Sequence, residues 1–119
     1  MTHSPATHAL SVNPATGETL AAYPWATSDE VQHAIALADS GFRQWRNESV
    51  AHRAQKLRDL GATLRNRAEE MAQMMSREMG KPILQARAEV AKSAGLCDWY
   101  AEHGPAMLRT EATLSLIHI

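Results

Sequence analysis

Histidines are the side chains that most often bind metals or transfer protons near neutral pH, and this chain has six of them. A zinc site on a helix typically needs a second histidine or a cysteine four residues away. None of the six has one: they are His3, His8, His33, His52, His103 and His118. We therefore expect solvated surface histidines rather than metal ligands or catalysts.

The only thiol, Cys97, is followed by Asp98 and His103, which could suggest a cysteine nucleophile. Val90 and Ala94 precede it at helical spacing, however, so the same position continues an apolar helix face. A cysteine on such a face behaves as a small apolar side chain. We expect Cys97 to be part of the core, and the chain has no nucleophile elbow, dinucleotide fingerprint or P-loop motif.

The elements that must position these residues begin with a β-hairpin over about 8–26. Two short extended runs, 8–12 and 19–23, flank the segment 13–18, which is rich in turn formers. Pro14 presets its own φ and Gly17 can take a positive φ, so the chain can reverse there. An isolated hairpin is marginally stable in water, so this one must pack on another element.

Three amphipathic helices are expected after the hairpin, over about 27–46, 50–79 and 82–102. Thr27 and Glu30 form a capping-box pattern at the first start, and Gly80-Lys81-Pro82 is a strong stop for the second helix. Gly104 and Pro105 predict the end of the third. Apolar residues recur in steps of three and four on each; they are Val31, Ile35, Phe42 and Trp45, then Leu57, Leu60, Leu64, Met71 and Met75, then Ala86, Val90, Ala94 and Cys97.

Both ends of the chain differ from this pattern. Residues 1–7 offer nothing to bury, and we expect a disordered tail. Residues 114–119 (LSLIHI) form an apolar run with no cap or periodic relation to what precedes it. This run resembles the translation of a sequencing adapter, so a non-native tail is predicted; the alternative is a short terminal strand.

Composition excludes several classes of protein. Hydrophobic residues make up 45% and charged residues 21%, which is typical of a soluble globular chain. A net charge of -1 provides no excess of cations for nucleic acid or an anionic membrane. The first residues lack a secretory signal pattern and no apolar run is long enough to span a bilayer. With one cysteine, the chain fits a reducing cytoplasm.

Five short segments occur in the order and at the intervals of one enzyme superfamily. They are 12–18 (VNPATGE), 42–46 (FRQWR), 78–82 (EMGKP), 88–90 (AEV) and 99–101 (WYA). Together they resemble the opening of the aldehyde dehydrogenase superfamily, over about residues 9–113. The run 97–105 (CDWYAEHGP) is similar to bacterial NAD(P)-dependent succinate-semialdehyde dehydrogenases.

The resemblance implies an α/β parent several times longer, of which residues 8–113 would be the N-terminal part of the cofactor-binding domain. The intact parent would bind NAD or NADP, would be a homo-oligomer, and would oxidise an aldehyde such as succinic semialdehyde to its acid. Its catalytic cysteine, glutamate and asparagine and its cofactor loop would all lie downstream. This chain by itself would then have no catalytic or cofactor-binding residues, would bind no cofactor and would be inactive.

Two site residues follow from the resemblance alone. Glu78 matches the position whose carboxylate, with main-chain oxygens near Ser11 and Val12, forms a structural cation site in some members; a solvated or salt-bridged Glu78 is the alternative. The last helix lines the substrate entrance in related enzymes, so Arg87 could attract a carboxylate-bearing aldehyde.

A different class of protein remains open from the residues alone. Four of the six methionines lie between Met71 and Met79, and they could line a groove of a free-standing helical interaction module. Such a module should close its own core and leave one bounded groove. The N-terminal part of a larger enzyme should instead leave the apolar faces of the hairpin and helices partly uncovered.

Overall fold

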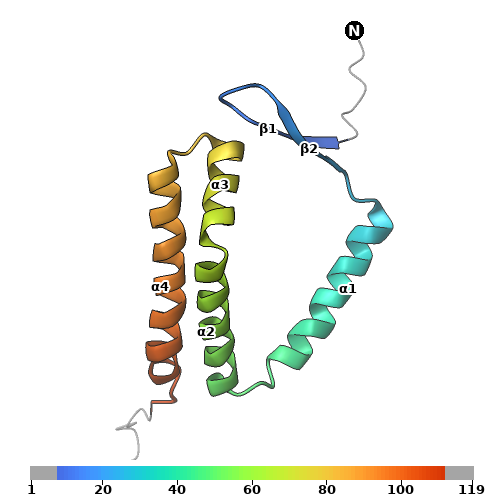
Figure 1. Cartoon of the computed structure of the whole chain (residues 1–119). Coiled ribbons are helices and arrows are strands. Elements are labelled where there is room, and N and C mark those ends of the chain that lie inside the picture. Colours follow the sequence, from blue (N-terminus) through green and yellow to red (C-terminus); the bar gives the residue numbers. More distant parts are fainter. Residues whose placement is uncertain (1–7, 112–119) are drawn as a thin grey trace, which may run out of the picture.

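The structure is a computed structural model that describes residues 8–111, and it shows a hairpin followed by four helices (Figure 1). The elements are β1 (His8–Val12), β2 (Thr19–Pro24), α1 (Ser28–Trp45), α2 (Val50–Asn66), α3 (Ala68–Met79) and α4 (Ile83–Met107). The mostly helical architecture with an N-terminal hairpin is confirmed. The predictions of a disordered tail at 1–7 and a non-native tail at 114–119 lie outside the described residues.

The hairpin forms where the turn residues predict it. β1 and β2 pair antiparallel, with Leu10 opposite Ala22 and an irregularity between Ser11 and Val12. In the turn, the Gly17 N–H donates to the Asn13 carbonyl at 2.8 Å, and Gly17 has φ +74°. The positive φ explains why a glycine occupies this position.

Helix α1 begins with the expected capping box. The Glu30 N–H donates to the Thr27 hydroxyl at 3.3 Å, and the Thr27 N–H donates to the Glu30 carboxylate at 2.7 Å. That backbone hydrogen bond from Thr27 is the main cause of a lowered pKa at Glu30. No residue of α1 is buried, however, and Ile35 and Phe42 on its apolar face are 57% and 59% exposed. Most of the predicted face therefore stays uncovered within residues 8–111.

The expected single helix over 50–79 is wrong, because the chain forms two helices in line that are separated at Arg67 (Figure 1). Arg67 has φ -108° and ψ 17°, outside helical values, and its guanidinium binds Glu70 through two hydrogen bonds of 2.9 and 2.6 Å. The apolar spacing continues across this residue, and no Gly or Pro marks it. The periodicity therefore could not reveal the break.

The expected end of the last helix at 102 is also wrong, since α4 continues to Met107 with Pro105 inside it. Proline has no N–H, so Pro105 leaves the carbonyl of Ala101, four residues earlier, without its helical donor. The Arg58 guanidinium from α2 supplies a donor to that carbonyl at 3.4 Å. A contact from another helix thus compensates for a residue that normally ends a helix.

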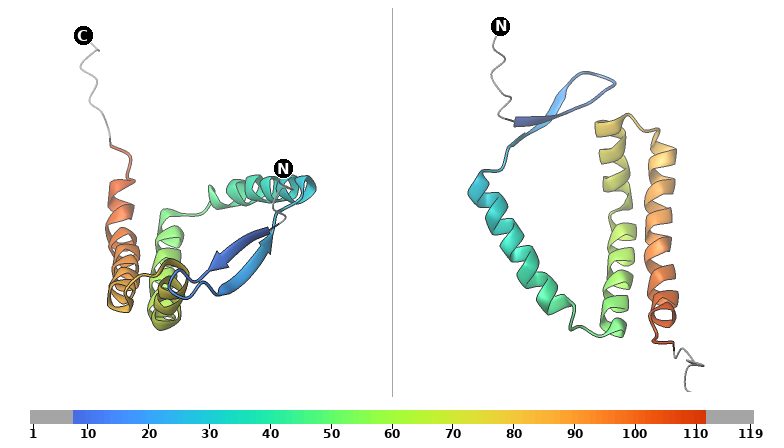
Figure 2. Two further views of the ribbon diagram at one scale, coloured as in Figure 1. Left: turned by 90° about the horizontal axis from the view of Figure 1, so that it is seen from above. Right: turned by 180° about the vertical axis from the view of Figure 1, so that it is seen from behind.

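The core is a narrow layer between α4 and the α2–α3 pair, and both views of Figure 2 show these helices side by side. Small residues dominate it; those buried are Ala54, Ala72, Ala86, Val90, Ala94 and Ala101. Gly61 is buried as well, on the α2 side. Small side chains let the helix backbones approach closely, but each buries little apolar area.

The overall shape is open rather than compact. The radius of gyration is 21.5 Å, whereas a compact domain of this length has about 13 Å. In the view from behind, α1 diverges from the α2–α4 pair while the hairpin lies beyond the end of α3 (Figure 2). Among residues 8–111, no helix combines the length and apolar character needed to cross a membrane.

Candidate functional site

Within residues 8–111 no three His, Cys, Asp or Glu side chains are grouped so that they could hold a metal ion. His52 contacts the Trp45 ring edge-on and lies 3.9 Å from the Glu48 carboxylate. The His103 ring stacks on Trp99 with centroids 4.4 Å apart, and its Nδ1 lies 2.8 Å from the Trp99 carbonyl. Each of these two histidines thus contacts an aromatic ring.

Cys97 is half-buried on the side of α4 that faces α2. A Cβ placed on Gly61 would lie only 3.3 Å from the Cys97 Cβ. The neighbouring Asp98 forms an ion pair with Arg65 and accepts a hydrogen bond from it, and this hydrogen bond raises the pKa of Arg65. Cys97 therefore lies on the apolar face that the helical spacing predicted, but it is only half-buried and is not one of the buried core residues.

Glu78 lies where the end of α3 meets the hairpin. Its carboxylate Oε1 accepts a hydrogen bond from the Ser11 hydroxyl at 3.1 Å. Gly80, two residues later, has φ +68°, and a Cβ there would lie 3.1 Å from Pro14 Cγ. The fold thus brings Glu78 next to the segment that the resemblance named, while the cation site itself stays a prediction.

Arg87 joins α4 to α3 through a two-pronged ion pair with Glu69. Its Nε and Nη2 donate to the two carboxylate oxygens, each at 2.8 Å. These hydrogen bonds, with a further one from Gln73, lower the pKa of Glu69 to about 2. A substrate carboxylate would have to compete with Glu69 for this guanidinium, and the role of Arg87 towards substrate stays a prediction.

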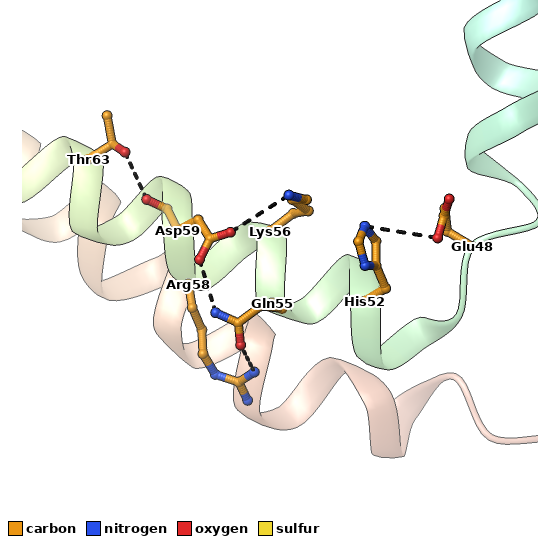
Figure 3. Close-up of polar contacts among 7 residues, drawn as sticks. All are labelled: Glu48, His52, Gln55, Lys56, Arg58, Asp59 and Thr63. Carbon is orange, nitrogen blue, oxygen red and sulfur yellow. Dashed lines mark hydrogen bonds and ion pairs between the residues drawn. The ribbon is translucent and has the colours of Figure 1, made fainter.

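Helix α2 carries a chain of polar contacts rather than a reactive cluster (Figure 3). Asp59 accepts a hydrogen bond from Gln55 at 2.9 Å and lies 3.9 Å from Lys56. The Thr63 hydroxyl donates to the Asp59 carbonyl at 2.9 Å. These exposed contacts, within one helix, each contribute little to stability.

An apolar pocket of about 460 Å³, here called the α2–α4 groove, lies where the start of α2 meets the end of α4. It is lined by Trp45, Val50, Arg53, Ala54, Lys56, Leu57, Leu60, Tyr100, Gly104, Pro105 and Leu108. Sequence reasoning missed it because Pro105 was expected to lie beyond the helix. Only the continuation of α4 brings residues 104–108 beside α2.

The groove contains two cations and an otherwise mainly apolar lining, so it provides binding surface rather than acid-base chemistry. The Arg53 Nε is buried and has no hydrogen-bond acceptor among residues 8–111. No nucleophile paired with a base occurs in the groove's lining. The arrangement can therefore receive an apolar group that carries an acceptor for Arg53.

Comparisons with known proteins give a consistent result. The family model described as "Aldehyde dehydrogenase family" matches residues 2–116. The chain is 67% identical over 114 residues to the succinate semialdehyde dehydrogenase [NAD(P)+] Sad of Escherichia coli, covering 96% of this chain and 25% of that protein. It is 37% identical to the succinate-semialdehyde dehydrogenase [NADP(+)] of Deinococcus radiodurans, over 82% of this chain and 20% of that one.

A solved structure agrees with these relatives. The crystal structure of succinate-semialdehyde dehydrogenase from Burkholderia pseudomallei superposes with a TM-score of 0.78 at 29% identity. It covers 91% of this chain and 23% of that one. The chain thus spans about a quarter of the length of the proteins that it matches.

Proposed function

The chain belongs to the aldehyde dehydrogenase family, and we propose that it forms the N-terminal part of the cofactor-binding domain of an NAD(P)-dependent enzyme that oxidises succinic semialdehyde to its acid. The observation that carries this proposal is the 67% identity to the E. coli enzyme over nearly the whole chain. The uncovered apolar face of α1 and the α2–α4 groove support it further, because together they leave more apolar surface exposed than one bounded groove would. An interaction module with one bounded groove is therefore not favoured.

The proposed reaction removes a hydride from the aldehyde carbon and adds one oxygen from water. NAD or NADP, when bound in the complete enzyme, accepts that hydride. A dinucleotide cradle needs a glycine-rich turn from a strand into a helix. The two described glycines with positive φ lie in the hairpin turn and at the end of α3. The residues present do not fit the cofactor, so we assign none of them to it.

The role that we propose for residues 8–111 is to cover and support the rest of the domain. Their helices would lie on the outside of the parallel sheet that the family's cofactor domain contains. We further propose that the complete enzyme is a cytoplasmic homo-oligomer that acts on a small aldehyde and binds neither nucleic acid nor membrane. The near-neutral net charge and the single cysteine support this proposal.

Replacing the matching first quarter of the E. coli relative with residues 8–113 of this chain tests the proposed role. We expect this chimaera to reduce NAD(P) with succinic semialdehyde. The absorbance of the reduced cofactor measures this reaction. The 119-residue chain alone should give no such reduction. A chimaera that folds but is inactive, or a turnover by the short chain alone, would contradict the proposal.

Two residue roles are proposed within this function. Arg87→Ala in the chimaera removes the guanidinium that would bind the substrate carboxylate. It should therefore raise the Michaelis constant for succinic semialdehyde more than for an uncharged aldehyde of equal length. An unchanged Michaelis constant would dispose of this role.

Glu78→Gln should weaken any stabilisation of the chimaera by monovalent or divalent cations. A cation dependence of stability equal to that of the parent chimaera would exclude the cation site.

A further inference from the structure

Arg53 is an anomaly in the α2–α4 groove. Its side chain is half-buried, and its Nε is shielded from solvent with no acceptor within the described part of the chain. The acidic residues on this part of the chain are engaged elsewhere: Glu48 lies beside His52, and Asp59 accepts from Gln55 and lies beside Lys56 (Figure 3). A buried donor of a charged group is costly when it lacks a partner.

The walls around Arg53 show what kind of partner is missing. Trp45 and Leu60 are 44% and 47% exposed, and Tyr100 and Leu108 are 53% and 65% exposed. These large apolar side chains lie together around one pocket rather than singly on the surface. A matching partner presents apolar side chains and one hydrogen-bond acceptor, for which a carboxylate is the strongest choice opposite a guanidinium.

We propose that the α2–α4 groove receives an apolar polypeptide segment that carries one aspartate or glutamate, supplied by the later part of the complete aldehyde dehydrogenase chain. The carboxylate would accept the Arg53 Nε–H and a second guanidinium N–H. This inference rests on the proposed function. Leu108 lines the groove, so the polypeptide that follows α4 starts at the groove, and the matched relatives are about four times longer than this chain.

The first test uses the active chimaera and three variants. Arg53→Met keeps the apolar stem but removes the donor, so the rate of thermal inactivation should rise about tenfold or more, as expected for a lost hydrogen bond to a charged group. Arg53→Lys keeps the charge and should have a smaller effect. The control Arg43→Met removes an exposed ion pair with Asp39 and should change the rate less than about twofold.

The second test identifies the partner. A carbodiimide joins a lysine amine to a carboxylate in direct contact, so the Arg53→Lys chimaera should cross-link to an Asp or Glu in the E. coli part of the same chain, as read by peptide mass spectrometry. Cross-links only to residues 8–113 or to another subunit, or none at all, would overturn the inference. So would an inactivation rate unaffected by Arg53→Met in an active chimaera, whereas an inactive parent chimaera would instead refute the proposed function.

Discussion

At the residue scale, the contact between α2 and α4 depends on the missing side chain of Gly61. A Cβ at this position would lie 3.0 Å from Asp98 Oδ1, 3.2 Å from the Ala94 carbonyl and 3.3 Å from Cys97 Cβ. The Ala94 carbonyl belongs to the helix backbone and cannot move alone. The core is built mainly of alanines, with Val90 as its one larger member, and such small side chains suit helices that approach this closely.

Gly61→Val should therefore destabilise the chain by about 1–3 kcal/mol through overpacking. Urea unfolding at low protein concentration, followed by far-UV circular dichroism, measures the change. Gly95→Val is the matched control, because nothing lies within 4 Å of a Cβ at Gly95 in α4. A similar loss of stability in both variants would show that helix propensity, not packing against α4, decides the effect.

The Arg87–Glu69 pair gives a pH dependence with a defined sign. The pKa of Glu69 is lowered from 4.5 to about 2, so folding favours its charged form. This contribution is fully present above pH 4.5 and is lost as the pH falls towards 2. We expect the melting temperature to decline in this interval by more in the wild type than in Glu69→Gln.

Arg87→Met offers an independent check of the cause. Without the guanidinium, the Glu69 carboxylate loses its principal donor and its pKa should return towards the ordinary value. The melting temperature of this variant should then depend on pH in the same interval about as weakly as that of Glu69→Gln. A pH dependence equal to that of the wild type would show that the ion pair does not form in solution.

At the scale of the elements, α4 is longer than its sequence predicted because α2 compensates for its proline. Pro105 has no N–H to donate to the Ala101 carbonyl, and Arg58 donates to that carbonyl instead. The two residues should therefore be energetically coupled through the Ala101 carbonyl. The consequence extends to the α2–α4 groove, since Gly104, Pro105 and Leu108 line it.

A double-mutant cycle measures this coupling. Arg58→Met alone should cost about 0.5–1.5 kcal/mol, because the Ala101 carbonyl loses the Arg58 donor. In the Pro105→Ala background the new N–H can serve that carbonyl, so Arg58→Met should cost less. Additive effects in urea unfolding would contradict the compensation.

At the scale of the whole molecule, α1 buries none of its residues within the described chain. Val31 and Trp45 are each 44% exposed on the same apolar side as Ile35 and Phe42. Helices normally owe most of their stability to burying such a face. The 119-residue chain should thus associate through these faces when it is alone.

Ile35→Glu with Phe42→Glu should reduce this association without unfolding α2 to α4, because neither residue is part of their core. Light scattering over a range of protein concentrations measures association, and far-UV circular dichroism measures helix content. Val90→Glu is the contrasting variant: it buries a charge in the core and should lower helix content. Equal association by the wild type and the double variant would exclude α1 as the associating surface.

The sequence by itself determined the local elements and the family. The Thr27–Glu30 cap, the Gly17 turn and the Gly80 stop all depend on residues close in the chain, and all three occur as predicted. Local hydrogen bonds and the φ that glycine allows decide such features, so residue types suffice to predict them. The ordered motifs likewise gave the family that the comparisons confirm.

Only the tertiary structure decided where α4 ends, which residues form the groove and what Arg87 contacts. Pro105 stays helical because Arg58 donates to the Ala101 carbonyl, although the two residues are 43 positions apart in the chain. Arg87 meets Glu69, 18 residues away, and the Arg53 Nε is buried without an acceptor from residues 8–111. These outcomes depend on contacts between separate helices, which no local pattern of residue types encodes.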